Sequence, residues 1–135
     1  MRVFVDCDDT LVLWLGEEGQ PLEGQNPYGG GAERWRWNHQ LVGFLLVLEF
    51  MMPEAEIVIW SGGGEQYART WRDRLAAVFP VVEGWACASK DTRVPTAEDT
   101  CIDDAELTVP AEVVTWQDVM AVLNEEEARG GADED

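Results

Sequence analysis

Three carboxylates follow a short apolar run at the start of the chain. The run covers residues 3–5, and Asp6, Asp8 and Asp9 come directly behind it. Like charges about 4 Å apart repel by ~1 kcal/mol in water and by ~4 kcal/mol at an effective dielectric near 20. Such a cluster at the end of a buried strand favours the binding of a cation. An acidic surface turn is the alternative that these residues alone leave open.

Three later apolar runs also end in polar residues. These are Ser61-Gly62 after residues 57–60, Lys90 after residues 85–88, and Asp103-Asp104 after residues 100–102. Each has a plain alternative, namely a serine cap on a helix, a surface lysine and a capped turn. Together they offer a hydroxyl, an ammonium group and further carboxylates, which suit the binding of an anion beside a metal ion.

The elements that would position these residues alternate along the chain. Strands are predicted over 3–5, 57–60, 85–88, 100–102 and 112–114, and helices over 33–52, 65–79 and 115–127. Strands separated by helices indicate an α/β fold: a single three-layer, Rossmann-like domain with a parallel sheet of about five strands and helices on both faces. Because the carboxyl ends of parallel strands share one edge, this fold would bring the candidate residues together.

Residues 13–32, between the first strand and the first helix, are rich in glycine and proline and predict a short flap. Four aromatic residues in or beside the flap are expected to pack it onto the core, with stacking on a substrate as the alternative. They are Trp14, Tyr28, Trp35 and Trp37. The flap carries loop and turn signals and does not form a domain of its own. We therefore predict one domain over 1–128, followed by a disordered acidic tail over 129–135.

The charge of the chain is strongly negative, because 27 acidic residues against nine basic ones give a formal net charge of −18. This field repels polyanions, so nucleic acid is disfavoured as a partner, although high salt would screen the repulsion. No run of 18 uncharged apolar residues occurs, which predicts no membrane partner. Cys7, Cys87 and Cys101 are widely spaced, which predicts reduced core thiols in a cytoplasmic protein.

The order of these segments resembles the haloacid dehalogenase (HAD) superfamily of phosphotransferases. That family carries a strand followed by Asp-x-Asp-x-Thr, a strand ending in Ser or Thr, a lysine, and a strand ending in Asp-Asp. The matching residues are Asp6-Cys7-Asp8-Asp9-Thr10, Ser61, Lys90 and Asp103-Asp104. All four motifs occur in order between residues 3 and 104.

The resemblance implies a Mg²⁺-dependent phosphomonoester hydrolase that acts through an aspartyl-phosphate on Asp6. Asp8 would be the general acid for the leaving group and then the base for the attacking water. Mg²⁺ would be bound by the carboxylates of Asp6 and Asp103 and the backbone carbonyl of Asp8, with Asp104 direct or through water.

The same resemblance assigns the phosphate group of the substrate to Thr10, Ser61, Gly62 and Lys90. A lysine and Mg²⁺ together neutralise the charge that keeps a carboxylate away from a phosphate dianion. Glycines at a helix N-terminus let backbone N–H groups approach an anion. The predicted partner is therefore a phosphorylated substrate.

Two departures from the family pattern affect the expected substrate. A loop containing Pro95 replaces the usual helix between Lys90 and Asp103. Members of this family without a cap take a large or protruding phosphoester, or borrow a lid from a second subunit of a homo-oligomer. The main alternative function is a non-catalytic HAD-like module that binds a phosphorylated ligand or a partner. The presence of both Asp6 and Asp8 favours the hydrolase.

Overall fold

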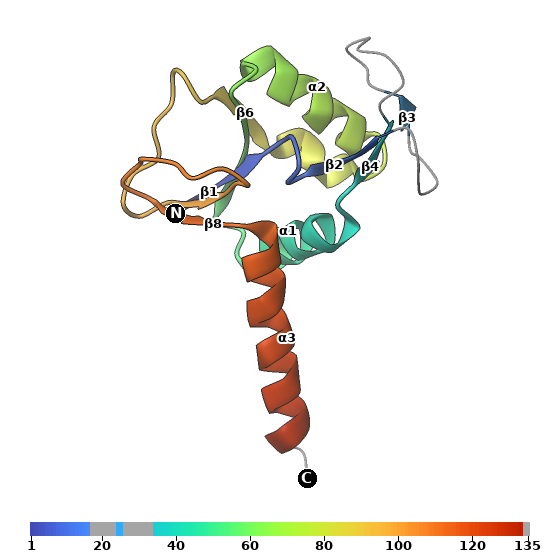
Figure 1. The fold of residues 1–135 in the computed structure, drawn as a ribbon, viewed down its shortest axis with the longest axis vertical. Helices are drawn as coiled ribbons and strands as arrows, with labels where there is room; N and C mark the ends of the chain where they lie inside the picture. The colour runs from blue at the N-terminus through green and yellow to red at the C-terminus, as the bar shows by residue number, and fades with distance from the viewer. Residues whose placement is uncertain (17–23, 26–33, 134–135) are drawn as a thin grey trace.

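The computed structural model describes residues 1–16, 24–25 and 34–133 (Figure 1). The main sheet contains β1 (Arg2–Asp6), β5 (Glu56–Ser61), β6 (Ala86–Ser89), β7 (Thr100–Ile102) and β8 (Glu112–Val114). A second, small sheet contains β2 (Val12–Gly16), β3 (Gly24–Gln25) and β4 (Arg34–Trp37). The helices are α1 (His39–Met51), α2 (Glu65–Ala76) and α3 (Trp116–Asp133), with a 3₁₀ turn, η1, over Pro80–Gly84.

The main sheet has the strand order β6-β5-β1-β7-β8, and all four pairings are parallel. The predicted α/β fold with a five-stranded parallel sheet is therefore confirmed. β1 is the central strand, because Val3 pairs with Ile57 of β5 on one side and with Thr100 of β7 on the other. A strand in this position is covered on both faces, which explains its continuous run of apolar residues.

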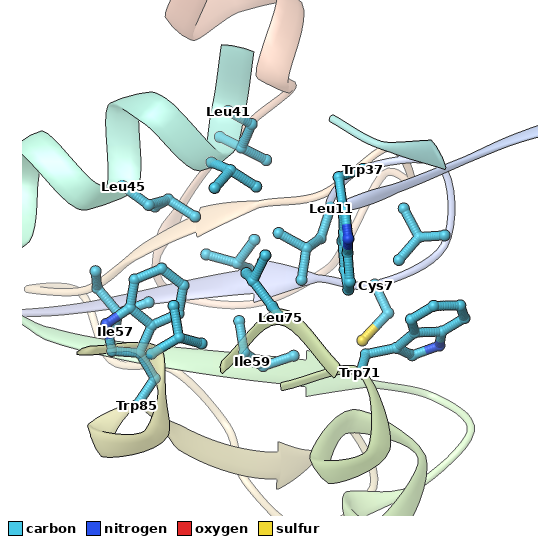
Figure 2. Close-up of a cluster of buried hydrophobic side chains, with 14 of the residues drawn as sticks. Cys7, Leu11, Trp37, Leu41, Leu45, Ile57, Ile59, Trp71, Leu75 and Trp85 are labelled. Carbon is cyan, nitrogen blue, oxygen red and sulfur yellow. The ribbon is translucent and has the colours of Figure 1, made fainter. Parts of the chain in front are cut away.

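Helices α1 and α2 cover the same face of the sheet. Figure 2 shows Leu41 and Leu45 of α1 and Leu75 of α2 in the same buried cluster as Ile57 and Ile59 of β5. These side chains belong to one buried cluster, which also takes in the odd-numbered positions of β1. The first residues of α3 pack against the edge of this cluster.

The opposite face of the sheet is covered by loops. Phe4, Val58 and Trp60 point to this side and pack against Ala111, which lies in the connection between β7 and β8. The guanidinium group of Arg93, in the connection between β6 and β7, lies 5.5 Å from the centre of the Phe4 ring. The prediction of helices on both faces, and hence of three layers, is therefore wrong. The two connections on this side are too short to hold a helix and cross the sheet.

The first helix also begins later than predicted. The segment 33–52 was expected to be helical, but residues 34–37 form β4, which pairs antiparallel with β2 and β3. Trp35 and Trp37 are both buried, as alternate residues of a strand against a core are. The spacing between these tryptophans and the apolar residues that follow also fits a helix. Only the pairing with β2 shows that the segment is a strand.

The start of α1 is set by Asn38. Its side-chain Oδ1 accepts a hydrogen bond from the backbone N–H of Leu41, and its own backbone N–H donates to the carbonyl of Leu11. Asn38 therefore caps the helix and ties it to the end of the β1 turn. Of the predicted flap, the structure describes β2 and β3, while residues 17–23 and 26–33 lie outside the described part of the chain.

Trp71 of α2 joins the small sheet to the main domain. It has no exposed surface, and its ring meets the rings of four other aromatic residues edge-on, with centroids 4.9–6.3 Å apart. These are Trp14 of β2, Trp35 and Trp37 of β4, and Tyr67 of α2. The expected packing of Trp35 and Trp37 onto the core is therefore confirmed, while Tyr28 lies outside the described residues.

The ends of the last two helices differ from the sequence prediction. α2 ends at Ala76 instead of at residue 79, and Val78, which lies beyond its end, is exposed. α3 continues to Asp133, through most of the segment predicted to be a disordered tail, and projects away from the sheet (Figure 1). Within the described residues, no helix is both long and apolar enough to cross a membrane. The three cysteines are free thiols, and Cys7 and Cys101 are buried as predicted.

The buried carboxylate of Asp99 binds backbone groups at the edge of the sheet where β1 begins. Its Oδ1 accepts a hydrogen bond from the backbone N–H of Arg2, and its Oδ2 accepts one from the backbone N–H of Thr96, at 3.1 and 2.8 Å. Burial raises the pKa of Asp99, but the hydrogen bonds from Thr96 and Arg2 outweigh it and leave the pKa below its ordinary value. The ionised form is therefore the one that the fold stabilises.

We expect Asp99→Asn to be less stable than the wild type at pH 7, by about 1–3 kcal/mol. The pKa of Asp99 is lower in the folded protein than in the unfolded chain, where it is about 3.9. Asp99 therefore contributes its full stabilisation at a pH above about 3.9, and this stabilisation is lost as the pH falls through the pKa of the folded protein. Urea denaturation of both proteins between pH 7 and pH 3 should show the difference shrinking with acid. The exposed Asp91, replaced by Asn, is the control. A difference that does not change with pH contradicts this account.

Candidate active site

Four strands of the main sheet end at one edge in, or directly before, the residues singled out from the sequence. β1 ends at Asp6 and β5 at Ser61, while Lys90 follows β6 and Asp103 follows β7. The strands are parallel, so these ends lie at the same edge. The backbone N–H of Lys90 donates to the carbonyl of Ser61 at 3.0 Å, which joins two of the four strand ends directly.

Lys90 connects carboxylates from two neighbouring strands. Its Nζ lies 3.1 Å from Oδ1 of Asp6 and 2.5 Å from Oδ2 of Asp103. The same Nζ lies 5.1 Å from the ring centre of Trp60, which adds a cation–π contact. Burial alone would lower the pKa of Lys90, but the hydrogen bonds and charges of Asp103 and Asp6 raise it above the ordinary value. Lys90 is therefore a fixed positive charge at this edge.

Asp104 completes a trio of carboxylates with Asp6 and Asp103. Each of the three offers one oxygen, and these oxygens lie within 4.8 Å of one another. Asp6 and Asp103 are buried and Asp104 is exposed, so the trio opens to solvent on one side. Oδ1 of Asp103 accepts a hydrogen bond from the backbone N–H of Ala105, which fixes that carboxylate. Carboxylate oxygens that open to water are the ligand set that Mg²⁺ prefers.

The electrostatics of Asp6 reflect this crowding. Burial raises the pKa of Asp6 to about 7, and the negative charge of Asp103 adds to the effect. The positive charge of Lys90 acts in the opposite direction. One ammonium group therefore does not compensate for the trio, and a bound cation would stabilise the fully ionised form.

The turn after β5 forms the N-terminus of α2 beside Lys90. Oγ of the buried Ser61 accepts a hydrogen bond from the backbone N–H of Gly63 at 3.0 Å. Gly64 is the N-cap residue, and its φ of 109° is one that only glycine adopts readily. A Cβ placed on Gly62 would lie 3.9 Å from the side chain of Lys90. The turn thus brings a helix N-terminus, which attracts anions, next to the lysine.

Thr10 lies beneath the candidate site. It has no exposed surface, and its hydroxyl donates to Oδ2 of Asp6 at 3.4 Å. Its backbone carbonyl accepts a hydrogen bond from the side-chain amide of Asn38. The hydroxyl of Thr10 is used within the protein, and a contact between Thr10 and a phosphate group stays a prediction. Thr10 supports the Asp6 carboxylate and connects the β1 turn to the start of α1.

Asp8 is not part of the carboxylate trio, and its Oδ1 faces β2 and α2. Its Oδ1 accepts a hydrogen bond from the hydroxyl of Tyr67 at 2.6 Å and one from the indole N–H of Trp14 at 3.0 Å. Burial and the bond to Asp8 raise the pKa of Tyr67 far above neutrality, so its hydroxyl remains a donor. The contact between Mg²⁺ and the backbone carbonyl of Asp8 stays a prediction.

Sequence reasoning missed both Tyr67 and Trp14 as site residues. It placed Trp14 in the flap and gave no role to Tyr67, and the spacing of neither residue indicates a contact with Asp8. One signal was available for Tyr67, which lies in the first turn of α2, directly after the Ser61-Gly62 turn. A residue there faces the same sheet edge as the turn itself.

Comparison of the chain with protein-family models, with curated proteins and with solved structures gives no match. The chemistry follows from the side chains. Asp6 is a buried carboxylate paired with a lysine, and Asp103 and Asp104 lie close enough to share a cation with it. A second carboxylate, Asp8, stands two residues away and is held by hydrogen bonds. This arrangement suits attack by a carboxylate on an anionic, metal-bound centre.

Proposed function

We propose that this chain is a Mg²⁺-dependent phosphomonoester hydrolase of the HAD type, with Asp6 as the nucleophile. The observation that carries the proposal is the position of Lys90, which pairs with both Asp6 and Asp103 while Asp104 lies within reach of the same oxygens. Holding a half-buried lysine between two carboxylates costs desolvation energy, which a site that uses the charge would explain. Binding a phosphoryl group beside a metal ion is a use that requires all of these groups.

Mg²⁺ would be held by the carboxylates of Asp6, Asp103 and Asp104, which fit its preference for oxygen ligands. When bound, the ion neutralises the charge on the phosphoryl group and on the approaching carboxylate. Lys90 supplies a second positive charge from the protein. Ser61 and the N–H groups of the Gly62 turn offer hydrogen bonds to the remaining phosphoryl oxygens.

The reaction has two displacements, and Asp8 moves one proton in each. In the first, an oxygen of Asp6 bonds to phosphorus, the bond from phosphorus to the alcohol oxygen breaks, and Asp8 gives its proton to that oxygen. In the second, a water oxygen bonds to phosphorus, Asp8 takes a proton from the water, and the bond between phosphorus and Asp6 breaks. One water is consumed, and both carboxyl groups return to their starting state.

The surroundings of the site favour a substrate with a single phosphate group. The described residues contain no cap helix over this edge, and Asp104 is exposed, so the site is open. The net charge of −18 repels a substrate in proportion to its negative charge. Monophosphates are therefore favoured over polyphosphates and polynucleotides. The activity is tested by measuring phosphate release from a panel of phosphomonoesters, with and without Mg²⁺, at low and high salt.

A thermal-shift experiment tests the metal site without knowledge of the substrate. At about 100 times its dissociation constant, Mg²⁺ should stabilise the wild type by ~2.7 kcal/mol and raise its melting midpoint by several degrees. Asp104→Asn should lose most of this increment. Its midpoint without metal should equal or exceed that of the wild type, because the change removes a charge from a crowded trio.

Glu54→Gln is the matched control, since Glu54 is exposed and lies beside the opposite edge of the sheet. It removes one negative charge from the chain and should keep the full Mg²⁺ increment. The midpoint in NaCl of equal ionic strength must be subtracted, because this acidic surface responds to any salt. If Asp104→Asn keeps the increment, or if Glu54→Gln loses it, the metal does not bind at the trio.

A further inference from the structure

Asp8 is held by two hydrogen-bond donors that come from different parts of the fold. Tyr67 lies on α2 and Trp14 on β2, and both donate to the same oxygen, Oδ1. We propose that Tyr67 and Trp14 are positioning residues for Asp8, which fix its carboxyl group so that Oδ2 is the atom that gives and takes the proton. This inference rests on the proposed function and extends it to two residues outside the motifs.

The two hydrogen bonds determine which oxygen of Asp8 carries the proton. A carboxyl oxygen has two lone pairs, and Oδ1 of Asp8 uses both as an acceptor from Tyr67 and Trp14. The proton of the acid form is then carried on Oδ2. The two hydrogen bonds, of 2.6 and 3.0 Å, also hold the Asp8 side chain in one rotamer, because a rotation of that side chain would break both of them. A fixed proton position is what general acid catalysis requires.

The donors are themselves held by packing. Trp71, which has no exposed surface, meets the ring of Trp14 at 6.0 Å and the ring of Tyr67 at 6.3 Å, both edge-on. One buried indole therefore positions both rings that reach Asp8. The small sheet thus has a role in the proposed reaction, since β2 brings Trp14 to Asp8.

The turn that follows Ser61 lies close to the ring of Tyr67. A Cβ placed on Gly63 would lie 3.2 Å from Cγ of Tyr67 and 3.4 Å from Oγ of Ser61, which is closer than most real contacts. A side chain at this position would therefore require the Tyr67 ring to shift by a few tenths of an ångström. The turn proposed to bind the phosphoryl group and the residue that orients Asp8 thus lie side by side.

The test uses Tyr67→Phe and Trp14→Phe, each of which removes a donor and keeps an aromatic ring. An alkyl phosphate needs protonation of its leaving oxygen, whereas 4-nitrophenyl phosphate does not. We expect kcat on the alkyl phosphate to fall about 10- to 100-fold, with less than about a threefold change on 4-nitrophenyl phosphate and an unchanged KM. In an Asp8→Asn background, the same substitutions should cause no further loss, because they act through Asp8.

Thr70→Val is the matched control, because Thr70 lies one turn further along α2 and its hydroxyl bonds only within the helix. It should leave both substrates unaffected. Equal losses on the two substrates, or no loss on the alkyl phosphate, would overturn the role of the donors. Either outcome leaves the proposed function standing if the wild type releases phosphate. A wild type that hydrolyses neither substrate overturns the proposed function itself, and this inference with it.

Discussion

Asp6→Asn should abolish phosphate release, with a loss on the order of a thousandfold or more in kcat/KM. An amide nitrogen or oxygen cannot replace the carboxylate as nucleophile, so no covalent intermediate forms on residue 6. The substitution nearly preserves shape. The fold should tolerate a neutral side chain there, because burial already raises the pKa of Asp6 to about 7. Steady-state release of phosphate from 4-nitrophenyl phosphate measures the loss.

Two further measurements make this result specific. Rapid quenching followed by intact-mass analysis should show a phosphorylated species in the wild type and none in Asp6→Asn. Asp91→Asn, an exposed change close to Lys90 in sequence, should retain full activity. Turnover by Asp6→Asn near the wild-type rate would falsify the nucleophile assignment. If the wild type binds phosphate but never turns over a monoester, the chain is instead a non-catalytic phospholigand-binding module.

The largest effect on stability is expected for Trp71→Ala, which should cost about 3–5 kcal/mol. Trp71 is completely buried and meets four aromatic rings, so its removal leaves a large cavity between α2 and the small sheet. Neighbouring indoles are too rigid to fill such a space. Urea denaturation, followed by circular dichroism, measures the change in the free energy of unfolding.

Trp71→Phe is the comparison that separates packing from the mere presence of an aromatic ring. It keeps most of the buried area and should cost clearly less than the alanine variant. Val122→Ala, at an exposed position of α3, should be close to neutral. A loss below about 1 kcal/mol for Trp71→Ala would mean that the small sheet is not anchored through this residue.

The central part of the fold was predictable because its signals are local. The runs 3–5 and 57–60 are short, continuous, apolar and rich in β-branched residues, which is typical of a strand buried on both faces. The position of the polar residues at the ends of these runs follows from the same prediction, because the carboxyl ends of parallel strands lie at one edge of the sheet. Asp6, Ser61, Lys90 and Asp103 could therefore be placed near one another without a structure.

Other features were not predictable because they depend on distant partners. Trp35 and Trp37 form a strand only because β2 lies beside them, and their own spacing fits a helix equally well. The loops over the second face show no periodicity that marks them as a covering layer. The contact between Tyr67 and Asp8 joins residues 59 positions apart, and the sequence around Tyr67 indicates only the sheet edge that this residue faces, not its partner.

The central position of β1 has a consequence for biosynthesis. β1 is synthesised before both of its neighbours, which are residues 56–60 on one side and residues 100–102 on the other. Sheets built from such distant pairings form slowly, since long loops must close before any contact is gained. During translation, this apolar strand has no partner until β5 has been made, and its second edge stays unpaired until β7 follows. The nascent chain is therefore most vulnerable to aggregation and to proteolysis before residue 102 emerges.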